Sequence, residues 1–207
     1  MDVTGLLLAG GRGTRMGTVD KGLQAFGGKP LAQHVLERLR PQVQGLLVNA
    51  NQNWMAYAAL GAPVLHDVID GFAGPLAGLH AGLLHCATPL LMTVPCDSPF
   101  LPSDLVVRLK VALLAQDADA AIAITSNGAT YQPQPVFALV KTSLLPQLAA
   151  FLSGGGRKVA AWYATLKVAG VEFADEAAFR NINTLDELRA LQQPRQNEES
   201  SPERRAK

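Results

Sequence analysis

A glycine-rich segment with interspersed cations lies between Leu6 and Lys29, and it reads LLLAGGRGTRMGTVDKGLQAFGGK. Glycine lets the main chain approach a ligand closely, and the backbone N–H groups of such a loop bind phosphate. Arg15 and Lys21 supply positive charge beside these glycines. The segment therefore predicts a phosphate site in which Arg15 and Lys21 hold a triphosphate and stabilise the charge of a leaving pyrophosphate.

This segment differs from two common phosphate-binding loops. A P-loop requires Gly-Lys-Ser/Thr at the start of a helix, whereas Gly22 follows Lys21 here. A dinucleotide-binding fold requires a helix directly after its glycines and an acidic residue at the end of its second strand. Here Pro30 delays the helix, and the second apolar run ends in Asn49-Ala50-Asn51. An NAD-dependent oxidoreductase is therefore disfavoured.

Polar side chains follow three other apolar runs. Asp97 comes just after residues 90–94, while Asn49 and Asp67 end two further runs. We expect the Asp97 carboxylate to bind Mg²⁺, which bridges nucleotide phosphates; the alternative is a helix cap. A carboxylate at Asp67 can accept from guanine N1–H and N2–H2, a donor pair that cytosine lacks, so Asp67 is a hypothesis for guanine preference. The alternative for Asn49 and Asp67 is a turn at a strand end.

Strands and helices alternate along the chain, which predicts a mostly parallel sheet covered on both faces. Continuous or nearly continuous apolar runs predict strands at residues 4–9, 45–49, 62–66, 90–94, 120–125, 136–140 and 167–173. Helical spacing predicts helices at residues 30–40, 54–60, 76–84, 102–114, 144–152 and 184–192, with a polar loop at 126–134. Ligands bind beyond the carboxyl ends of such strands. Gly10, Asn49, Asp67 and Asp97 should therefore converge on one site.

Composition sets the limits of this interpretation. The 207 residues are 48% hydrophobic and carry a net charge of +1, which argues for a globular chain and against electrostatic binding of nucleic acid. We expect one Rossmann-like three-layer α/β/α domain over residues 1–192. Residues 193–207 have almost nothing to bury, so they are expected to form a disordered tail. Two cysteines without CxxC spacing, and no signal-peptide or bilayer-length run, predict a cytoplasmic protein without membrane attachment.

The glycine-rich segment resembles the nucleotidyltransferase signature, and the sequence as a whole is similar to the molybdenum cofactor guanylyltransferase family. The resemblance rests on Leu8-Ala9-Gly10-Gly11, Arg15-Met16-Gly17, Asp20-Lys21, Gly28-Lys29-Pro30-Leu31, Asn49-Ala50-Asn51, Asp67, Gly74-Pro75-Leu76-Ala77-Gly78, Pro95-Cys96-Asp97-Ser98-Pro99 and Asn181-Ile182-Asn183-Thr184. It extends to about Gln192 and implies an Mg²⁺-dependent enzyme that transfers GMP from GTP to the phosphate of molybdopterin and releases pyrophosphate.

The resemblance also implies roles for individual residues. It assigns Asn49 and Asp67 to GTP binding and implies nucleoside contacts for Leu8, Ala9 and Gly10. With Lys21 and Asp97 from the argument above, these are the GTP-binding candidates, and Arg15, Lys21 and Asp97 are the expected catalytic residues. For molybdopterin, the candidates are Arg157, Lys158, Asn181 and Asn183. The alternatives are a solvated helix start at Arg157-Lys158 and a turn with an N-cap at 181–184. The chain departs from its relatives at 132–135, where they often carry a basic or histidine residue before the proline.

Several alternatives stay open. A molybdopterin cytidylyltransferase would keep the chemistry and use CTP, which nucleotide competition would decide. A non-catalytic nucleotide-binding regulator on the same fold would bind GTP without releasing pyrophosphate. A sugar-phosphate nucleotidyltransferase is less favoured because it usually needs more chain for its sugar pocket. The resemblance further implies transient contacts with other cofactor-biosynthesis proteins and acceptor molybdoenzymes, and we expect a monomer.

Overall fold

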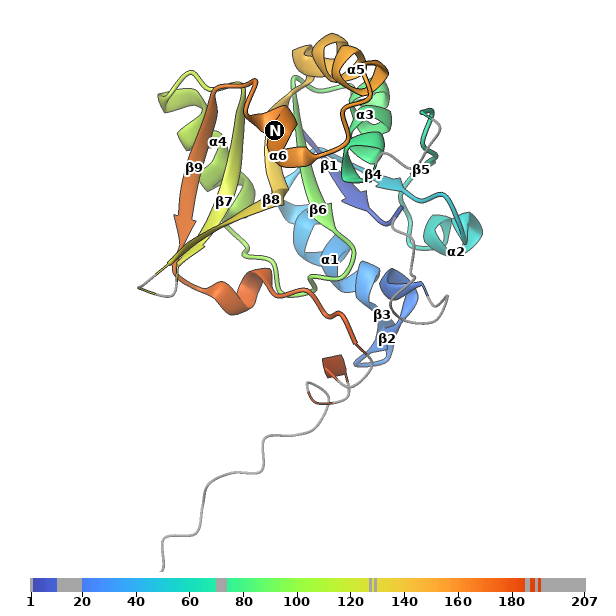
Figure 1. Ribbon diagram of the computed structural model, residues 1–207. Coiled ribbons are helices and arrows are strands. Elements are labelled where there is room, and N and C mark those ends of the chain that lie inside the picture. Colours follow the sequence, from blue (N-terminus) through green and yellow to red (C-terminus); the bar gives the residue numbers. More distant parts are fainter. Residues whose placement is uncertain are drawn as a thin grey trace, which may run out of the picture.

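The computed structural model describes residues 2–10, 20–69, 74–126, 128, 130–184, 187, 188 and 190. Within these ranges the chain forms a seven-stranded sheet with helices on both faces and a separate two-stranded hairpin (Figure 1). The predicted three-layer α/β class is therefore confirmed. Arg15 and the predicted tail at 193–207 lie outside the described residues. Among the described helices, none combines the length and apolar composition that a bilayer span needs.

The large sheet runs in the order β5-β4-β1-β6-β8-β7-β9. Its strands are β1 (Val3–Leu8), β4 (Gly45–Asn49), β5 (Val64–Leu65), β6 (Leu90–Pro95), β7 (Ala120–Ser126), β8 (Tyr131–Lys141) and β9 (Val168–Phe173). Neighbouring strands are parallel except at β8, which is antiparallel to both β6 and β7. The carboxyl ends of β5, β4, β1 and β6 consequently meet at one edge of the sheet.

Helices cover both faces of this sheet because its central strands are apolar on both sides. One layer contains α1 (Leu31–Leu39), α2 (Trp54–Ala58) and α4 (Leu105–Ala115), and the other contains α3 (Pro75–His85), α5 (Leu145–Ser153) and α6 (Val159–Tyr163). Short 3-10 segments are η2 (Lys21–Leu23), η3 (Arg40–Gln42), η4 (Thr142–Leu144) and η5 (Glu176–Phe179). In β1, the fully buried Leu6 and Leu7 pack into opposite layers, as the unbroken apolar run predicts.

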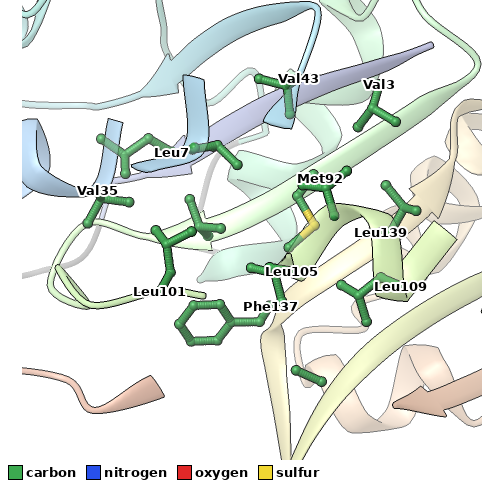
Figure 2. Packing of buried hydrophobic residues seen from close by; sticks show 14 of the residues in the cluster. Val3, Leu7, Val35, Val43, Met92, Leu101, Leu105, Leu109, Phe137 and Leu139 are labelled. Carbon is green, nitrogen blue, oxygen red and sulfur yellow. The ribbon is translucent and has the colours of Figure 1, made fainter. Parts of the chain in front are cut away.

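The larger core lies between the sheet and the α1–α4 layer. Figure 2 shows Leu7 beside Val35 of α1 and Met92 beside Leu105 of α4, all of them without exposed surface and in one cluster. Burying side chains of this size contributes about 1.5–3 kcal/mol each before the cost of chain ordering. The core therefore fixes β1 and β6 relative to each other, and their carboxyl ends carry the site described below.

The structure differs from the sequence prediction in three places. The predicted loop at 126–134 is wrong in its second half, since β8 already begins at Tyr131 and pairs with β7 across a register shift after Ile122. Prolines at 133 and 135 lack a donor, but this stretch of β8 pairs only with β7 and needs donors on one side. The hairpin of β2 (Ala25–Phe26) with β3 (Lys29–Pro30) and helix α6 were not predicted.

Candidate functional site

A cavity of about 470 Å³ opens at the carboxyl ends of β1, β4 and β6. Its described lining is Leu8, Ala9, Gly10, Asp20, Lys21, Asn49, Asp67, Gly74, Pro75, Pro95, Cys96, Asp97, Val136 and Asn181. Apart from Arg15, which lies outside the described residues, every residue assigned to GTP from the sequence is in this group. The convergence follows from the topology, because parallel strands present their carboxyl ends at one edge.

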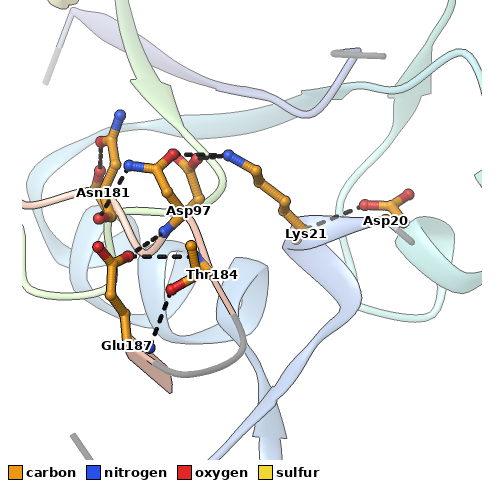
Figure 3. A network of polar contacts seen from close by, with 9 residues as sticks. Asp20, Lys21, Asp97, Asn181, Thr184 and Glu187 are labelled. Atoms are coloured by element: carbon orange, nitrogen blue, oxygen red, sulfur yellow. Dashed lines mark hydrogen bonds and ion pairs between the residues drawn. The ribbon is translucent and has the colours of Figure 1, made fainter. Parts of the chain in front are cut away.

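Asp97 and Lys21 form an ion pair at one end of this cavity (Figure 3). Nζ of Lys21 lies 3.5 Å from Oδ2 of Asp97, and the Asp97 side chain is only 13% exposed. Burial raises the pKa of the Asp97 carboxyl above its ordinary value, and the positive charge of Lys21 opposes this shift. The pair thus holds a carboxylate and an ammonium ready for a charged ligand.

Asp20 anchors the turn that presents Lys21. Its Oδ1 accepts a 3.1 Å hydrogen bond from the backbone N–H of Gly22 and a 2.6 Å bond from the hydroxyl of Tyr57. Its Oδ2 accepts from Nδ2 of Asn53 at 3.0 Å. Asp20 thereby caps η2, whose first residue is Lys21. A side chain at position 22 would collide with Tyr57, because an added Cβ would lie 2.4 Å from its hydroxyl oxygen.

Asp67 is held by two asparagines on the neighbouring strand end. Nδ2 of Asn49 donates to Oδ1 of Asp67 at 2.9 Å, and Nδ2 of Asn51 donates to Oδ2 at 2.7 Å. The backbone N–H of Asp67 in turn donates to Oδ1 of Asn51 at 2.9 Å. Each carboxylate oxygen therefore has one amide donor and keeps further acceptor capacity for a ligand.

The segment at 181–184 closes another side of the cavity. The backbone N–H of Ile182 donates to the carbonyl oxygen of Asp97 at 2.8 Å, which ties this segment to the end of β6. Oγ of Ser98 donates to Oδ1 of Asn181 at 2.5 Å, and Nζ of Lys21 donates to Oδ1 of Asn183 at 2.7 Å. Asn181 lines the cavity, and Asn183 reaches it through Lys21.

Thr184 and Glu187 form a capping box after this segment. Oγ1 of Thr184 accepts from the N–H of Glu187 at 3.1 Å, and Oε2 of Glu187 accepts from the N–H groups of Thr184 and Asn183 (Figure 3). This reciprocal arrangement satisfies donors that a helix start leaves unpaired. The segment 181–184 therefore forms the turn with an N-cap that was one alternative, and it also contacts residues of the cavity.

Arg157 and Lys158 lie elsewhere in the described structure. Nη1 of Arg157 donates to the carbonyl oxygens of Leu152 and Gly156, at 2.8 and 2.7 Å, and so satisfies the end of α5. Lys158 is exposed and directly precedes α6. Neither belongs to the described lining of the cavity. Their assignment to molybdopterin stays a prediction.

Three residues of the described site were not given a role from the sequence: Asp20, Asn51 and Tyr57. Asp20 directly precedes Lys21 in the sequence, and Asn51 belongs to the motif that begins with Asn49. Their position within these motifs could have identified both residues as part of the site. Tyr57 carries no such signal, since it lies on α2 within an ordinary helical pattern. The described residues contain no cluster of three or more His, Cys, Asp or Glu side chains suited to a metal.

Comparison with known proteins agrees with this geometry. The family profile of the MobA-like NTP transferase domain matches residues 5–168. A molybdenum cofactor guanylyltransferase from Cupriavidus necator is 58% identical over 189 residues, which cover 91% of this chain and 95% of that protein. A protein of the same name from Bordetella petrii is 56% identical over 190 residues, covering 92% and 97% respectively.

Solved structures share the fold. The molybdopterin-guanine dinucleotide biosynthesis protein A from Archaeoglobus fulgidus superposes with a TM-score of 0.73 at 26% identity, over 91% of this chain and 96% of that one. A CMP:2-keto-3-deoxy-manno-octonic acid synthetase superposes with a TM-score of 0.70 at 15% identity, over 92% and 98%. The second likeness concerns the fold alone.

Proposed function

This chain belongs to the MobA-like NTP transferase family, and we propose that it transfers GMP from GTP to the phosphate of molybdopterin and releases pyrophosphate. The observation that carries the proposal is the convergence of three kinds of group on one cavity. These are the main chain at the end of β1, the Lys21–Asp97 ion pair and the amide-held carboxylate of Asp67. They suit a nucleoside, a triphosphate and a purine edge, respectively.

The transfer is an in-line displacement at phosphorus. An oxygen of the molybdopterin phosphate forms a bond to the α-phosphorus of GTP, and the bond from that phosphorus to the α–β bridging oxygen breaks. The bridging oxygen leaves with pyrophosphate. Lys21, whose Nζ lies at the cavity, would stabilise the charge that develops on this leaving group, together with Arg15.

We further propose that Mg²⁺ assists this reaction and that Asp97 holds it. Mg²⁺ in nucleotide sites is commonly bound through one or two carboxylates together with substrate phosphates and water, so a three-residue protein cluster is unnecessary. The partly buried Asp97 carboxylate, which faces Lys21 and lines the cavity, fits this donor set. When bound, the ion would neutralise phosphate charge during transfer.

Asp67 would select the base, since its free acceptor positions suit the N1–H and N2–H2 donors of guanine. Leu8, Ala9, Gly10 and Asn49 complete the nucleoside side of the cavity. Asn183 accepts from Lys21 and Asn181 accepts from Ser98, next to Asp97 in the chain, and we assign the molybdopterin phosphate to these two asparagines. We propose a cytosolic monomer that receives and hands on the cofactor through transient contacts with its biosynthesis and acceptor proteins.

The direct test is calorimetric binding of GTP, CTP and ATP in the presence of Mg²⁺, for the wild type and Asp97→Ala. We expect selective GTP binding that the substitution weakens or makes insensitive to metal. Pyrophosphate release with GTP and molybdopterin should follow the same selectivity. Preference for CTP would favour a cytidylyltransferase, and GTP binding without pyrophosphate release would favour a non-catalytic regulator.

A further inference from the structure

Asn51 is joined to Asp67 by two hydrogen bonds that run in opposite directions. Its side-chain N–H donates to Oδ2 of Asp67 at 2.7 Å, and its side-chain oxygen accepts from the backbone N–H of Asp67 at 2.9 Å. One amide therefore fixes both the main chain and the carboxylate of Asp67. The 2.9 Å bond from Asn49 to Oδ1 fixes the second carboxylate oxygen, so the plane of this carboxylate is determined on both sides.

The fold brings these three side chains together by strand pairing. Val48 pairs with Val64 and Asn49 with Leu65, and the N–H of Ala50 donates to the carbonyl oxygen of Leu65 at 2.9 Å. The two strand ends are thus aligned side by side. Position 51 follows one end and position 67 follows the other, which places their side chains within contact.

The glycine at position 10 allows the asparagines to pack against the end of β1. An added Cβ at Gly10 would lie 2.9 Å from Oδ1 of Asn49 and 3.1 Å from Nδ2 of Asn51. Both distances are shorter than ordinary van der Waals contact. A larger residue at this position would therefore force the two amides to shift from the places in which they donate to Asp67.

We propose that Asn51 is a positioning residue for base selection, which orients the Asp67 carboxylate toward the edge of the guanine. This inference rests on the proposed function, because it explains how Asp67 would be oriented for the selection of guanine that is proposed above. Asn51 acts through Asp67 and does not itself line the described cavity, whereas Asn49 and Asp67 do.

The physical basis is the orientation of a carboxylate. A carboxylate on a single-bonded stem rotates, and its torsion is broad when nothing holds it. Two amide donors, one on each oxygen, restrict that rotation and leave the remaining lone pairs aimed in a fixed plane. A purine that offers two neighbouring N–H donors gains from this preorganisation, while one that offers a single donor gains less.

The test compares GTP with ITP, which lacks the 2-amino group and so offers one donor fewer. Binding of both nucleotides with Mg²⁺ would be measured by calorimetry for the wild type, Asn51→Ala, Asn51→Asp and the control Gln52→Ala. Gln52 is exposed and adjacent in sequence, which makes it a matched control. We expect the wild type to prefer GTP by about tenfold or more, since a hydrogen bond to a charged group is worth about 1.5–3 kcal/mol.

For Asn51→Ala, the ratio of GTP to ITP affinity should fall several-fold, while Gln52→Ala should keep the wild-type ratio. Asn51→Asp has the same shape but faces an Oδ2 lone pair of Asp67 with a second carboxylate. Its ratio should also fall, because the second carboxylate repels that of Asp67 and offers it no N–H donor. Thermal unfolding of each variant shows whether it is folded.

The outcomes separate the inference from the proposed function. A wild type that prefers GTP over ITP and CTP, with an unchanged ratio in both Asn51 variants, overturns the inference alone. Equal weakening of GTP and ITP binding also overturns it, because that is the result of general loosening of the site. A wild type that binds GTP, ITP and CTP equally overturns the proposed guanine selection and the inference with it.

Discussion

The hydroxyl of Tyr57 donates a 2.6 Å hydrogen bond to Oδ1 of Asp20 from a position without exposed surface. Burial raises the pKa of this phenol, so it remains a donor across the accessible pH range. Asp20 also caps the short helix that begins at Lys21, so a side chain from α2 helps to fix the turn that carries Lys21. Tyr57 therefore connects the buried face of α2 to Asp20, which lines the cavity.

Tyr57→Phe should lower kcat/KM for GTP by about tenfold, because a hydrogen bond to a charged group contributes about 1.5–3 kcal/mol. The ring and its packing stay, while Asp20 keeps the Gly22 and Asn53 donors. Steady-state kinetics with GTP and molybdopterin would measure the effect, and thermal unfolding would measure the loss of stability.

Tyr163→Phe is the matched control for Tyr57→Phe. Tyr163 is also buried, and its hydroxyl donates to the carbonyl oxygen of Pro135 at 3.0 Å, away from Asp20. The control should lose stability and retain kcat/KM. If both variants lose stability equally and Tyr57→Phe keeps wild-type kinetics, Tyr57 has a packing role only.

Asp97→Asn should raise the Tm at pH 7 and abolish most of the activity. Burial raises the pKa of Asp97, with Lys21 opposing the shift. A carboxyl of this kind favours the folded state while it is protonated, and that contribution is lost as the pH rises through its folded pKa. At neutral pH the wild type carries the cost of a partly buried charge, which the amide does not.

The direction of this stability effect can be checked by measuring the Tm of Asp97→Asn and of the wild type as a function of pH. The gain of Asp97→Asn over the wild type should shrink as the pH falls toward the ordinary carboxyl pKa of 3.8, where the wild-type carboxyl also becomes neutral. Activity should fall on the order of 100-fold or more if Asp97 holds the proposed Mg²⁺, because a bound ion supplies several kcal/mol of charge stabilisation. A lower Tm at pH 7 would show that the pairing with Lys21 outweighs the cost of burial.

Gly78→Ala should destabilise the protein by about 1–3 kcal/mol, the usual cost of an overpacked contact, and weaken GTP binding. An added Cβ would lie 2.4 Å from Oδ1 of Asn49 and 2.7 Å from Cδ2 of Leu8, and both residues line the cavity. Gly45→Ala is the control, because its Cβ would meet nothing within 4 Å. Calorimetry with GTP and denaturant unfolding would separate the two effects; unchanged GTP binding in Gly78→Ala would contradict the expected displacement of Asn49.

Arg157→Ala should lower the free energy of unfolding by about 1 kcal/mol, since it removes a donor to the Leu152 carbonyl in the last turn of α5 and to the Gly156 carbonyl just beyond it. Lys158→Ala is the neighbouring control and should leave stability unchanged. The KM for molybdopterin would be measured in both variants. A higher KM with an unchanged Tm would instead support direct contact of these cations with the second substrate.

The sequence predicted the site where strand topology alone decides it. Residues at the ends of parallel strands share an edge whatever their rotamers, so Gly10, Asn49, Asp67 and Asp97 could be expected to converge, and they do line one cavity. The unbroken apolar run of β1 likewise required two covered faces. The convergence of the strand ends and the covering of both faces depend only on backbone direction and burial, and both can be predicted from the pattern of residue types.

The pattern could not supply contacts that depend on side-chain direction. The hydrogen bond from Asn51 to Asp67 requires a particular rotamer at each residue. Arg157 could face either a ligand or the end of the helix that precedes it, α5. The start of β8 at Tyr131 was missed for a related reason. Its polar residues and prolines suggest a loop, but pairing with β7 on one side only makes a strand possible.

Lys21 and Asn183, which share a 2.7 Å hydrogen bond, are 162 positions apart in the chain. Ribosomes deliver a protein from its amino end, at about 5–20 residues per second, so the glycine-rich segment emerges many seconds before its asparagine partner. During that interval Nζ of Lys21 lacks its contact with Asn183, and the carbonyl of Asp97 lacks the N–H of Ile182. The nascent chain thus completes these polar contacts of Lys21 and Asp97 only when translation is nearly finished.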